Sequence, residues 1–353
     1  MQTIKIKASK NYNVVIDNNF NNLAQKVKNV FNGKKILLLS DSNVFAIYGN
    51  QVKNSLCDFN VIEYVIDAGE QSKNAHTYIK IINFLAENQF TRDSLVFALG
   101  GGVVGDIAGF VAATYMRGIK LIQCPTTLLS CVDSSVGGKT GVNLESGKNL
   151  LGCFYQPSLV FINVKTLLSL PKEQLLNGMG EICKYAFLSK KIDKEMLKEE
   201  NREKLIEVCI KIKAQIIHKD EFEKGKRMLL NLGHTIGHAI ENLSNYTIPH
   251  GICVAKGIEK IIDVSRKFYN ISQEKVNKLK ELLNLFCFDL SINYTNQQIK
   301  EKVILDKKAR ANSINFVLIK DIAKVKIEKI SIDKLGELLQ WFIHFRHLML
   351  MAI

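Results

Sequence analysis

Short apolar runs alternate with stretches of helical spacing through the first half of the chain. Four apolar runs predict buried strands, at residues 35–40, 61–66, 94–99 and 120–124. Apolar positions at helical spacing predict two helices among them, over residues 75–88 and 105–116. The N-terminal segment alternates apolar and polar side chains, as a strand does. Alternation of strands and helices favours a parallel sheet with helices on its faces.

The pattern changes near residues 160–170, and beyond Pro171 the apolar positions recur mostly at helical spacing. Helices are predicted over residues 173–186, 193–215, 228–243, 254–269 and 273–285. A last amphipathic helix is predicted from Ile332. We therefore predict an α/β N-terminal domain with a Rossmann-like parallel sheet over residues 1–165 and an α-helical domain over residues 166–340. The cleft between two such domains is the expected place for a ligand.

The final segment, residues 341–353, is apolar on nearly all sides and its role is unknown from the pattern. It is too short to span a bilayer, which needs about 20 apolar residues. We expect this tail to be dispensable for the activity of the protein.

Composition narrows the class of protein. With 353 residues, 47% of them hydrophobic, the chain is long enough for one or two domains with full cores. The N-terminus lacks the pattern of a signal peptide, and no run of about 18 apolar residues predicts a membrane span. The eight cysteines are scattered without C-x-x-C spacing, which indicates neither a zinc ribbon nor a disulfide framework. We expect a reduced, cytoplasmic protein with no membrane partner.

The net charge of +14 raises the question of a nucleic-acid partner. The basic residues are spread along the whole chain, however, and basic patches interleaved with aromatic residues are missing. A small substrate that carries phosphate and carboxylate groups would equally favour a positive cleft. We therefore expect no nucleic-acid partner.

A glycine-rich turn follows the predicted strand at residues 94–99. Gly100, Gly102 and Gly105 satisfy the G-x-G-x-x-G pattern between a strand and a helix. Glycines in such a turn let the backbone approach a dinucleotide pyrophosphate at the N-terminus of the helix. Tight packing of strand against helix is the alternative explanation, because no acidic residue follows about 20 positions later.

Four residues have the chemistry of metal ligands. His234 and His238 are four positions apart on a predicted helix and therefore share one of its faces. His250 follows in Pro249-His-Gly, and Glu181 is an acidic candidate. A histidine of such a pair can also be a hydrogen-bonded core residue. Spacing leaves open which three of the four bind.

Basic residues recur next to glycine-rich, otherwise apolar segments. Lys139 and Lys148 each follow a glycine, Lys184 lies one helical turn beyond Glu181, and Arg227 precedes Asn231 by one turn. Each alone is most simply a surface charge. Their recurrence beside glycine-rich backbone predicts binding of phosphate and carboxylate groups.

Together these segments resemble the 3-dehydroquinate synthase family of sugar-phosphate cyclases, from about residue 35 to residue 320. The matching motifs are Gly100–Asp106, Pro125–Leu129, Val132–Thr140, Gly147–Asn149, Phe154–Pro157, Leu230–Thr235 and Asp306–Lys308. The resemblance implies a phosphorus–oxygen lyase of the shikimate pathway, which leads to the aromatic amino acids. Such an enzyme converts 3-deoxy-D-arabino-heptulosonate 7-phosphate to 3-dehydroquinate and phosphate. Family enzymes proceed by transient oxidation with NAD, phosphate elimination, reduction and an intramolecular aldol step.

The resemblance also implies cofactors and residue roles. Glu181, His234 and His250 would bind a divalent metal, zinc or cobalt, and His238 would handle a proton or form a hydrogen bond near the site. NAD contacts would be Asp41, Asn43, Gly69, Glu70, Lys73, Gly102, Val103, Val104, Gly105, Asp106, Thr126, Thr127, Asp133, Lys139, Lys148, Thr166, Leu167, Leu168 and Ser169. Substrate contacts would be Asp133, Lys139, Asn149, Lys184, Lys213, Arg227, Asn231, His234, His238 and His250. Arg117 would reach the phosphate site of a neighbouring subunit, which implies a homodimer.

The chain departs from the family pattern in three places. Ile252 follows His250-Gly where the family usually has Glu, and Cys131 replaces a common Gln. The stretch after Lys308, residues 309–315, lacks the usual basic residue nearer Phe316, so no late substrate lysine is assigned. Two related activities compete with this interpretation: a metal-dependent polyol dehydrogenase, which needs no cluster of basic residues, and a cyclase that acts on another heptulose phosphate.

Overall fold

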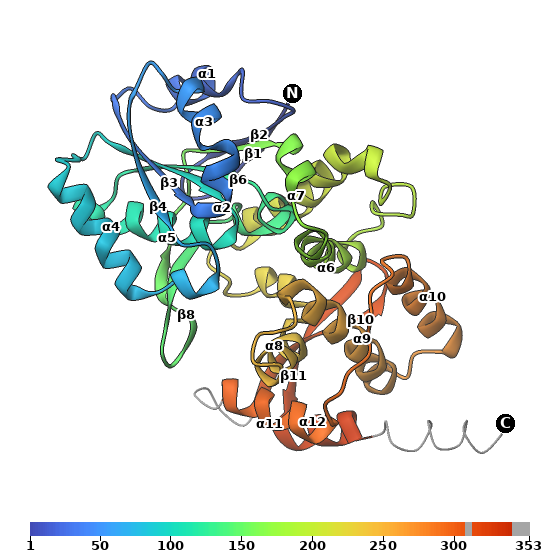
Figure 1. The fold of residues 1–353 in the computed structure, drawn as a ribbon. Helices are drawn as coiled ribbons and strands as arrows, with labels where there is room; N and C mark the ends of the chain where they lie inside the picture. The colour runs from blue at the N-terminus through green and yellow to red at the C-terminus, as the bar shows by residue number, and fades with distance from the viewer. Residues whose placement is uncertain (308–312, 341–353) are drawn as a thin grey trace. The chain divides into compact units, whose positions relative to one another are not determined.

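The computed structural model describes residues 1–307 and 313–340, which fall into two compact units (Figure 1). The first unit comprises residues 1–175 and 199–222, and the second comprises residues 176–198 and those from 223 onward. The predicted tail at 341–353 and the predicted motif residue Lys308 lie outside the described residues. The domain boundary at residues 165/166 stays a prediction.

The first unit is built on a seven-stranded sheet with the order β1-β2-β9-β6-β5-β3-β4. Its strands are β1 (Gln2–Ile6), β2 (Tyr12–Asp17), β3 (Lys35–Asp41), β4 (Asn60–Ile66), β5 (Leu95–Gly100), β6 (Lys120–Pro125) and β9 (Leu159–Asn163). Neighbouring strands are parallel except β1, which pairs with β2 in the antiparallel sense. The predicted parallel sheet is confirmed, while β2 and β9 were not predicted.

Both faces of this sheet are covered, which explains the continuous apolar runs in its central strands. On β3, Leu37 and Leu39 belong to a core with Ile81 and Leu85 of α4 (Ala75–Glu87). The alternate residues of β3 belong to the opposite core, with Leu23 of α1 (Leu23–Lys28) and with α3 (Asn50–Ser55). The core of the first face also contains α5 (Gly102–Thr114). The predicted helices at 75–88 and 105–116 are thus confirmed as α4 and α5.

Two helices and a hairpin also belong to the first unit. A short helix, α2 (Ser42–Val44), follows β3, and α7 (Arg202–Lys219) comes from the second half of the chain. Strands β7 (Lys139–Leu144) and β8 (Gly147–Phe154) form an antiparallel hairpin, which was not predicted. This hairpin packs on α5 where Gly109 leaves room: a Cβ on Gly109 would lie 2.3 Å from Thr140 Cγ2.

The second unit is mostly helical, as predicted, but it also contains a two-stranded antiparallel sheet. Its helices are α6 (Lys172–Leu188), α8 (His234–Leu243), α9 (His250–Tyr269), α10 (Gln273–Asn284), α11 (Asn296–Lys307) and α12 (Ile332–Gln340). The sheet pairs β10 (Ser313–Asp321) with β11 (Lys324–Ser331). None of the described helices is long and apolar enough to cross a membrane.

Two predicted helices are shorter than expected, for local reasons. The helix predicted over 193–215 begins only at Arg202, because Asp193 accepts a hydrogen bond from the Met196 N–H and starts a turn instead. The helix predicted over 228–243 is interrupted at Gly233, whose φ of +79° is left-handed. The 3₁₀ turn Lys226–Asn231 precedes this break and α8 follows it.

Candidate metal centre and cofactor site

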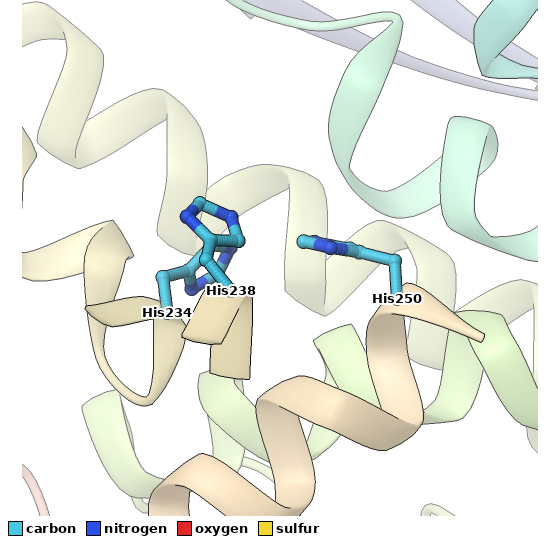
Figure 2. A group of neighbouring side chains, drawn as sticks. All are labelled: His234, His238 and His250. Carbon is cyan, nitrogen blue, oxygen red and sulfur yellow. The ribbon is translucent and has the colours of Figure 1, made fainter. Parts of the chain in front are cut away.

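Three histidines converge in the second unit (Figure 2). His234 and His238 lie one turn apart on α8, and His250 is the first residue of α9. A ring nitrogen of each lies within 4.8 Å of a ring nitrogen of the others, and the ring centroids are 5.3–5.6 Å apart. The shared helix face predicted for His234 and His238 is confirmed.

Glu181, on α6, joins this cluster. Its Oε1 lies 3.4 Å from Nε2 of His234 and 3.3 Å from Nε2 of His250. Its other oxygen, Oε2, forms an ion pair with Lys184 one turn further along α6. Two metal–ligand bonds of about 2.1 Å at a tetrahedral angle place their ligand atoms roughly 3.4 Å apart. Glu181 Oε1 therefore lies from each of these two histidine nitrogens at the spacing of neighbouring ligands on one metal ion.

The remaining nitrogens of two rings are held by oxygen acceptors. His234 Nδ1 lies 3.2 Å from the Leu232 carbonyl oxygen, and His250 Nδ1 lies 3.1 Å from Glu241 Oε2. An Nδ1–H that donates to such an oxygen leaves the Nε2 lone pair for a metal, in the arrangement typical of metal-bound histidines. Sequence reasoning missed Glu241, although it lies two turns after His234 on α8. It gives His250 a carboxylate partner in a chain that has Ile252 in place of the family's Glu.

The charges around Glu181 favour a bound cation. Burial disfavours its carboxylate, but Lys184 and His234 together hold the pKa of Glu181 well below its usual value. Burial also disfavours a charged His250, yet its hydrogen bonds to Glu181 and Glu241 raise its pKa to about 9. A proton on His250 thus occupies the electrostatic role that a metal ion would take over. This donor set fits a divalent metal.

Glycines allow the three ligand-bearing helices to approach each other. A Cβ on Gly180 would lie 2.0 Å from the Gly251 carbonyl oxygen, so α6 and α9 touch through their backbones. A Cβ on Gly237 would lie 2.8 Å from the Cys253 carbonyl oxygen, which joins α8 to α9 in the same way. Each of these glycines is adjacent in sequence to a histidine or to Glu181. The glycines consequently set the spacing of the candidate ligands.

The basic and amide residues of the second unit that are predicted to bind substrate lie on α6 and on the turn before α8. Lys184 and Arg227 are both only 1% exposed. Asn231 ends the 3₁₀ turn that contains Arg227, and its Nδ2 donates to Glu223 Oε1 at 2.6 Å. The buried charge of Lys184 is balanced within the unit by its ion pair with Glu181.

In the first unit, the predicted cofactor residues gather where the sheet topology reverses. From β3 the chain continues to β4 on one side and then to β5 on the other. Ligands of parallel α/β sheets bind at the carboxyl ends of strands at such a point. Asp41 ends β3, and its Oδ1 accepts hydrogen bonds from the N–H groups of Asn43 and Val44, both at 3.0 Å.

The glycine-rich turn follows β5, the strand next to β3, at the same edge of the sheet. Gly100 ends β5 and α5 begins at Gly102, so the first N–H groups of α5 have no side-chain cap from Gly101. Unpaired N–H groups at a helix N-terminus attract phosphate. The Thr126 N–H donates to the Gly100 carbonyl oxygen at 3.0 Å, while the buried Thr126 hydroxyl finds no hydrogen-bond partner in the described part of the chain. This edge fits a ligand with phosphate and hydroxyl groups.

A buried lysine joins three other predicted cofactor or substrate residues beside this turn. Lys73 is 5% exposed, and its Nζ lies 2.6 Å from Asp106 Oδ2 and 2.5 Å from Asn149 Oδ1. Burial opposes its charge, but Asp106 and Glu70 raise the pKa of Lys73. Glu70 begins a 3₁₀ turn directly after Gly69, whose φ of +118° is left-handed.

The other predicted residues of the first unit belong to several separate elements. Val103, Val104 and Gly105 form the first turn of α5, Thr127 follows Thr126, Lys139 begins β7, and Lys148 lies on β8. Asp133 pairs with Lys213 of α7. The Lys213 Nζ lies 3.0 Å from the Asp133 carboxylate and 2.6 Å from the Asp133 carbonyl oxygen.

Two predicted contacts have a local structural role as well. The segment Thr166–Ser169 belongs to a 3₁₀ turn, in which the Thr166 hydroxyl donates to the Asn163 carbonyl oxygen at 2.8 Å and Leu168 is 77% exposed. Arg117 lies in a turn with a left-handed φ of +66°. Within each unit the predicted residues are brought together in these groups. Their roles toward ligands stay predictions.

Comparison with known proteins gives two family matches that follow one another along the chain. Residues 63–177 match the 3-dehydroquinate synthase N-terminal family, and residues 178–309 match the 3-dehydroquinate synthase C-terminal family. A 3-dehydroquinate synthase of Clostridium acetobutylicum is 42% identical over 346 residues, covering 94% of this chain and 97% of that protein. One of Francisella tularensis subsp. holarctica is 40% identical over 352 residues, covering 94% and 96%.

Solved structures with the same fold include two synthases and an alcohol dehydrogenase. A 2-deoxy-scyllo-inosose synthase, complexed with carbaglucose-6-phosphate, NAD+ and Co2+, has a TM-score of 0.87 at 25% identity and covers 96% of this chain and 99% of its own. A 2-epi-5-epi-valiolone synthase from Streptomyces hygroscopicus subsp. jinggangensis, with NAD+ and Zn2+ bound, has a TM-score of 0.84 at 21% identity, covering 96% and 98%. An iron-containing alcohol dehydrogenase is more distant, with a TM-score of 0.64 at 16% identity, covering 94% and 97%. The predicted fold class is confirmed.

Proposed function

The chain belongs to the 3-dehydroquinate synthase family, and we propose on that premise that it converts 3-deoxy-D-arabino-heptulosonate 7-phosphate to 3-dehydroquinate and phosphate. The observation that carries the proposal is the position of Glu181 Oε1, at nearly equal distance from Nε2 of His234 and Nε2 of His250. It adds the geometry of a metal site to the family membership of the chain.

Glu181, His234 and His250 hold the divalent metal in this proposal. A bound zinc or cobalt ion acts as a Lewis acid toward the hydroxyl groups of the substrate. Lys184 keeps Glu181 Oε2 occupied, so that Oε1 faces both imidazoles. Glu241 orients the ring of His250 through its Nδ1.

In the first unit, the N-terminal turn of α5, Asp41 and Asn43 would hold NAD. NAD would supply a hydride acceptor for the substrate alcohol. Lys73 remains charged through Asp106 and offers a cation to the ligand. Thr126 contributes its buried hydroxyl.

Basic side chains hold the two acidic ends of the substrate. We assign Lys139 and Lys148 to the phosphate or the carboxylate, and Lys184, Lys213, Arg227, Asn149 and Asn231 to the remaining polar contacts. His238, exposed at the edge of the histidine cluster, handles the proton of the reacting hydroxyl. The substrate class is therefore a phosphorylated sugar acid, and Arg117 of a second copy completes the phosphate site in a cytoplasmic homodimer.

Phosphate release by the purified protein, with and without NAD, tests the proposal. The synthase is expected to release one phosphate per substrate, to require NAD and metal, and to accumulate no NADH. A polyol dehydrogenase would instead accumulate NADH in proportion to product. A cyclase for another heptulose phosphate would release phosphate from that sugar and not from 3-deoxy-D-arabino-heptulosonate 7-phosphate. Either of these results would refute the proposed function.

A further inference from the structure

The β7–β8 hairpin contains an irregularity that involves predicted site residues. Near the tip of the hairpin β7 has one residue, Asn143, between two paired positions, where β8 has residues 148–150. Extra residues in one strand form a β-bulge, which redirects side chains and is common beside active sites. The bulge contains Lys148 and Asn149, both predicted to contact ligands.

The side chain of Asn143 replaces the missing ladder contact in this bulge. Asn149 has a left-handed φ of +57°, and its N–H donates to Asn143 Oδ1 at 2.9 Å. In this conformation Asn149 Oδ1 faces Lys73 and accepts a hydrogen bond from its Nζ. The carbonyl oxygen of the Asn143 amide thus fixes the direction of Asn149.

The other end of the same amide reaches the predicted cofactor turn. Asn143 Nδ2 donates to Glu70 Oε1 at 2.7 Å, and the Asn143 backbone N–H donates to the Lys73 carbonyl oxygen at 2.9 Å. Glu70 and Lys73 are predicted NAD contacts. One side chain therefore connects the bulge that carries Lys148 to the turn that carries Glu70.

We infer that Asn143 is a positioning residue that couples NAD binding at the Glu70–Lys73 turn to substrate binding at the Lys148–Asn149 bulge. The inference rests on the proposed function, because the roles of the turn and the bulge come from it. An amide is suited to this position, since it offers an acceptor and a donor at once, whereas a carboxylate offers acceptors only. Binding of one ligand then orders the segment that receives the other, and the effect is reciprocal.

Substitution of Asn143 by Asp tests the two side-chain hydrogen bonds separately, because it keeps one and removes the other. Asn143→Asp keeps an acceptor for the Asn149 N–H but turns a carboxylate oxygen toward Glu70. We expect the metal-loaded protein to bind NAD at least about tenfold more weakly by calorimetry, since a hydrogen bond to a charged group is replaced by repulsion. Asn143→Ala removes both contacts, and its kcat/KM for the substrate is expected to fall roughly tenfold or more, because small misplacements of binding groups are costly.

The double variant N143D/E70Q tests whether the two residues act on each other. In this variant the amide introduced at position 70 donates to the carboxylate introduced at position 143, so the hydrogen bond is restored with reversed roles. Within the E70Q background, N143D is therefore expected to change NAD affinity by less than about threefold. The control is Asn11→Asp, the same chemical change at an exposed position where Asn11 Oδ1 accepts a hydrogen bond from the local Ala8 N–H at 3.3 Å. Metal content and thermal midpoint of all variants are measured alongside.

The outcomes separate the inference from the proposed function. If the wild-type protein neither binds NAD nor releases phosphate, the proposed function fails and the inference with it. If the wild-type protein does both, while N143D and N143A match it in NAD affinity and kcat/KM, the inference alone is wrong. A loss of NAD affinity from N143D that is equal in the wild-type and E70Q backgrounds would likewise overturn the coupling.

Discussion

Gly180→Ala is expected to disrupt metal binding although residue 180 is not itself a candidate metal ligand. A helix interior prefers Ala over Gly by about 0.5–1 kcal/mol, so propensity alone predicts a more stable protein. The added Cβ would lie 2.0 Å from the oxygen, 2.2 Å from the carbonyl carbon and 2.5 Å from the Cα of Gly251. All three atoms are backbone, so no side-chain rotation relieves the collision.

The required displacement can be compared with the tolerance of a metal site. Cβ contacts below 3.0 Å are essentially never seen, so α6 and α9 must separate by roughly 1 Å at this point. Glu181 follows Gly180 directly and His250 precedes Gly251, so the displacement acts on two candidate ligands that now lie 3.3 Å apart. Metal–ligand distances tolerate only about 0.2 Å. We expect metal affinity to fall by at least roughly 10–100-fold, the range found when the support of a ligand is removed.

Titration of metal-free protein with Co2+, followed by visible absorption, measures this effect. The control is Gly336→Ala on α12, where the added Cβ would meet the flexible end of the Lys300 side chain at 2.5 Å. This control should keep wild-type metal affinity. If Gly180→Ala is folded by circular dichroism and binds Co2+ within about twofold of the control, the role given to the glycine contact is wrong.

Three further predictions concern the candidate site directly. After dialysis against a chelator, His250→Ala should contain no metal, whereas His238→Ala should keep a full equivalent and turn over more slowly by roughly 10²–10⁴; full metal content in His250→Ala would contradict the ligand assignment. Because the pKa of His250 is raised to about 9 without metal, metal must displace its proton, and apparent metal affinity measured in buffered titrations should rise about tenfold per pH unit between pH 7 and 9. The raised pKa of His250 also adds to the free energy of unfolding of the metal-free protein. This contribution is complete below pH 6.5 and should be lost as the pH rises through 9, which denaturant titrations measure. Lys148→Met should raise the substrate KM far more than the dissociation constant of NAD, and equal losses would assign Lys148 to the cofactor.

The sequence predicts the sheet where burial alone determines the pattern. Residues 36–39 are apolar because both faces of β3 are covered, and this signal needs no knowledge of neighbouring strands. The β7–β8 hairpin has no such signal, since its strands contain Gly141 and Gly152 and several exposed residues. It is stabilised by packing on α5 at Gly109, a contact between segments about 30 residues apart.

In the candidate site too, the sequence predicts local features but not contacts between distant segments. The spacing of His234 and His238 predicts a shared helix face, because helical periodicity is local. Glu181 and His250 are 69 positions apart, and no spacing rule connects them. Their chemistry made them candidates, and the family resemblance selected them, with His234, as the ligands. Glu241 and Asn143 were missed, because the role of each depends on a helix contact or a bulge that only the folded chain contains.

The division of the chain into units has a consequence for its synthesis on the ribosome. Helix α6 is made before α7, yet from residue 176 onward it belongs with elements that begin only at residue 223. The first unit, in turn, lacks α7 until residue 222 has been translated. Each unit consists of two separate segments of the chain, so neither can finish folding until its second segment has been translated. The apolar face of α6 must therefore wait, exposed or shielded by a chaperone, while α7 completes the earlier unit, and this interval is where aggregation during expression is expected to begin.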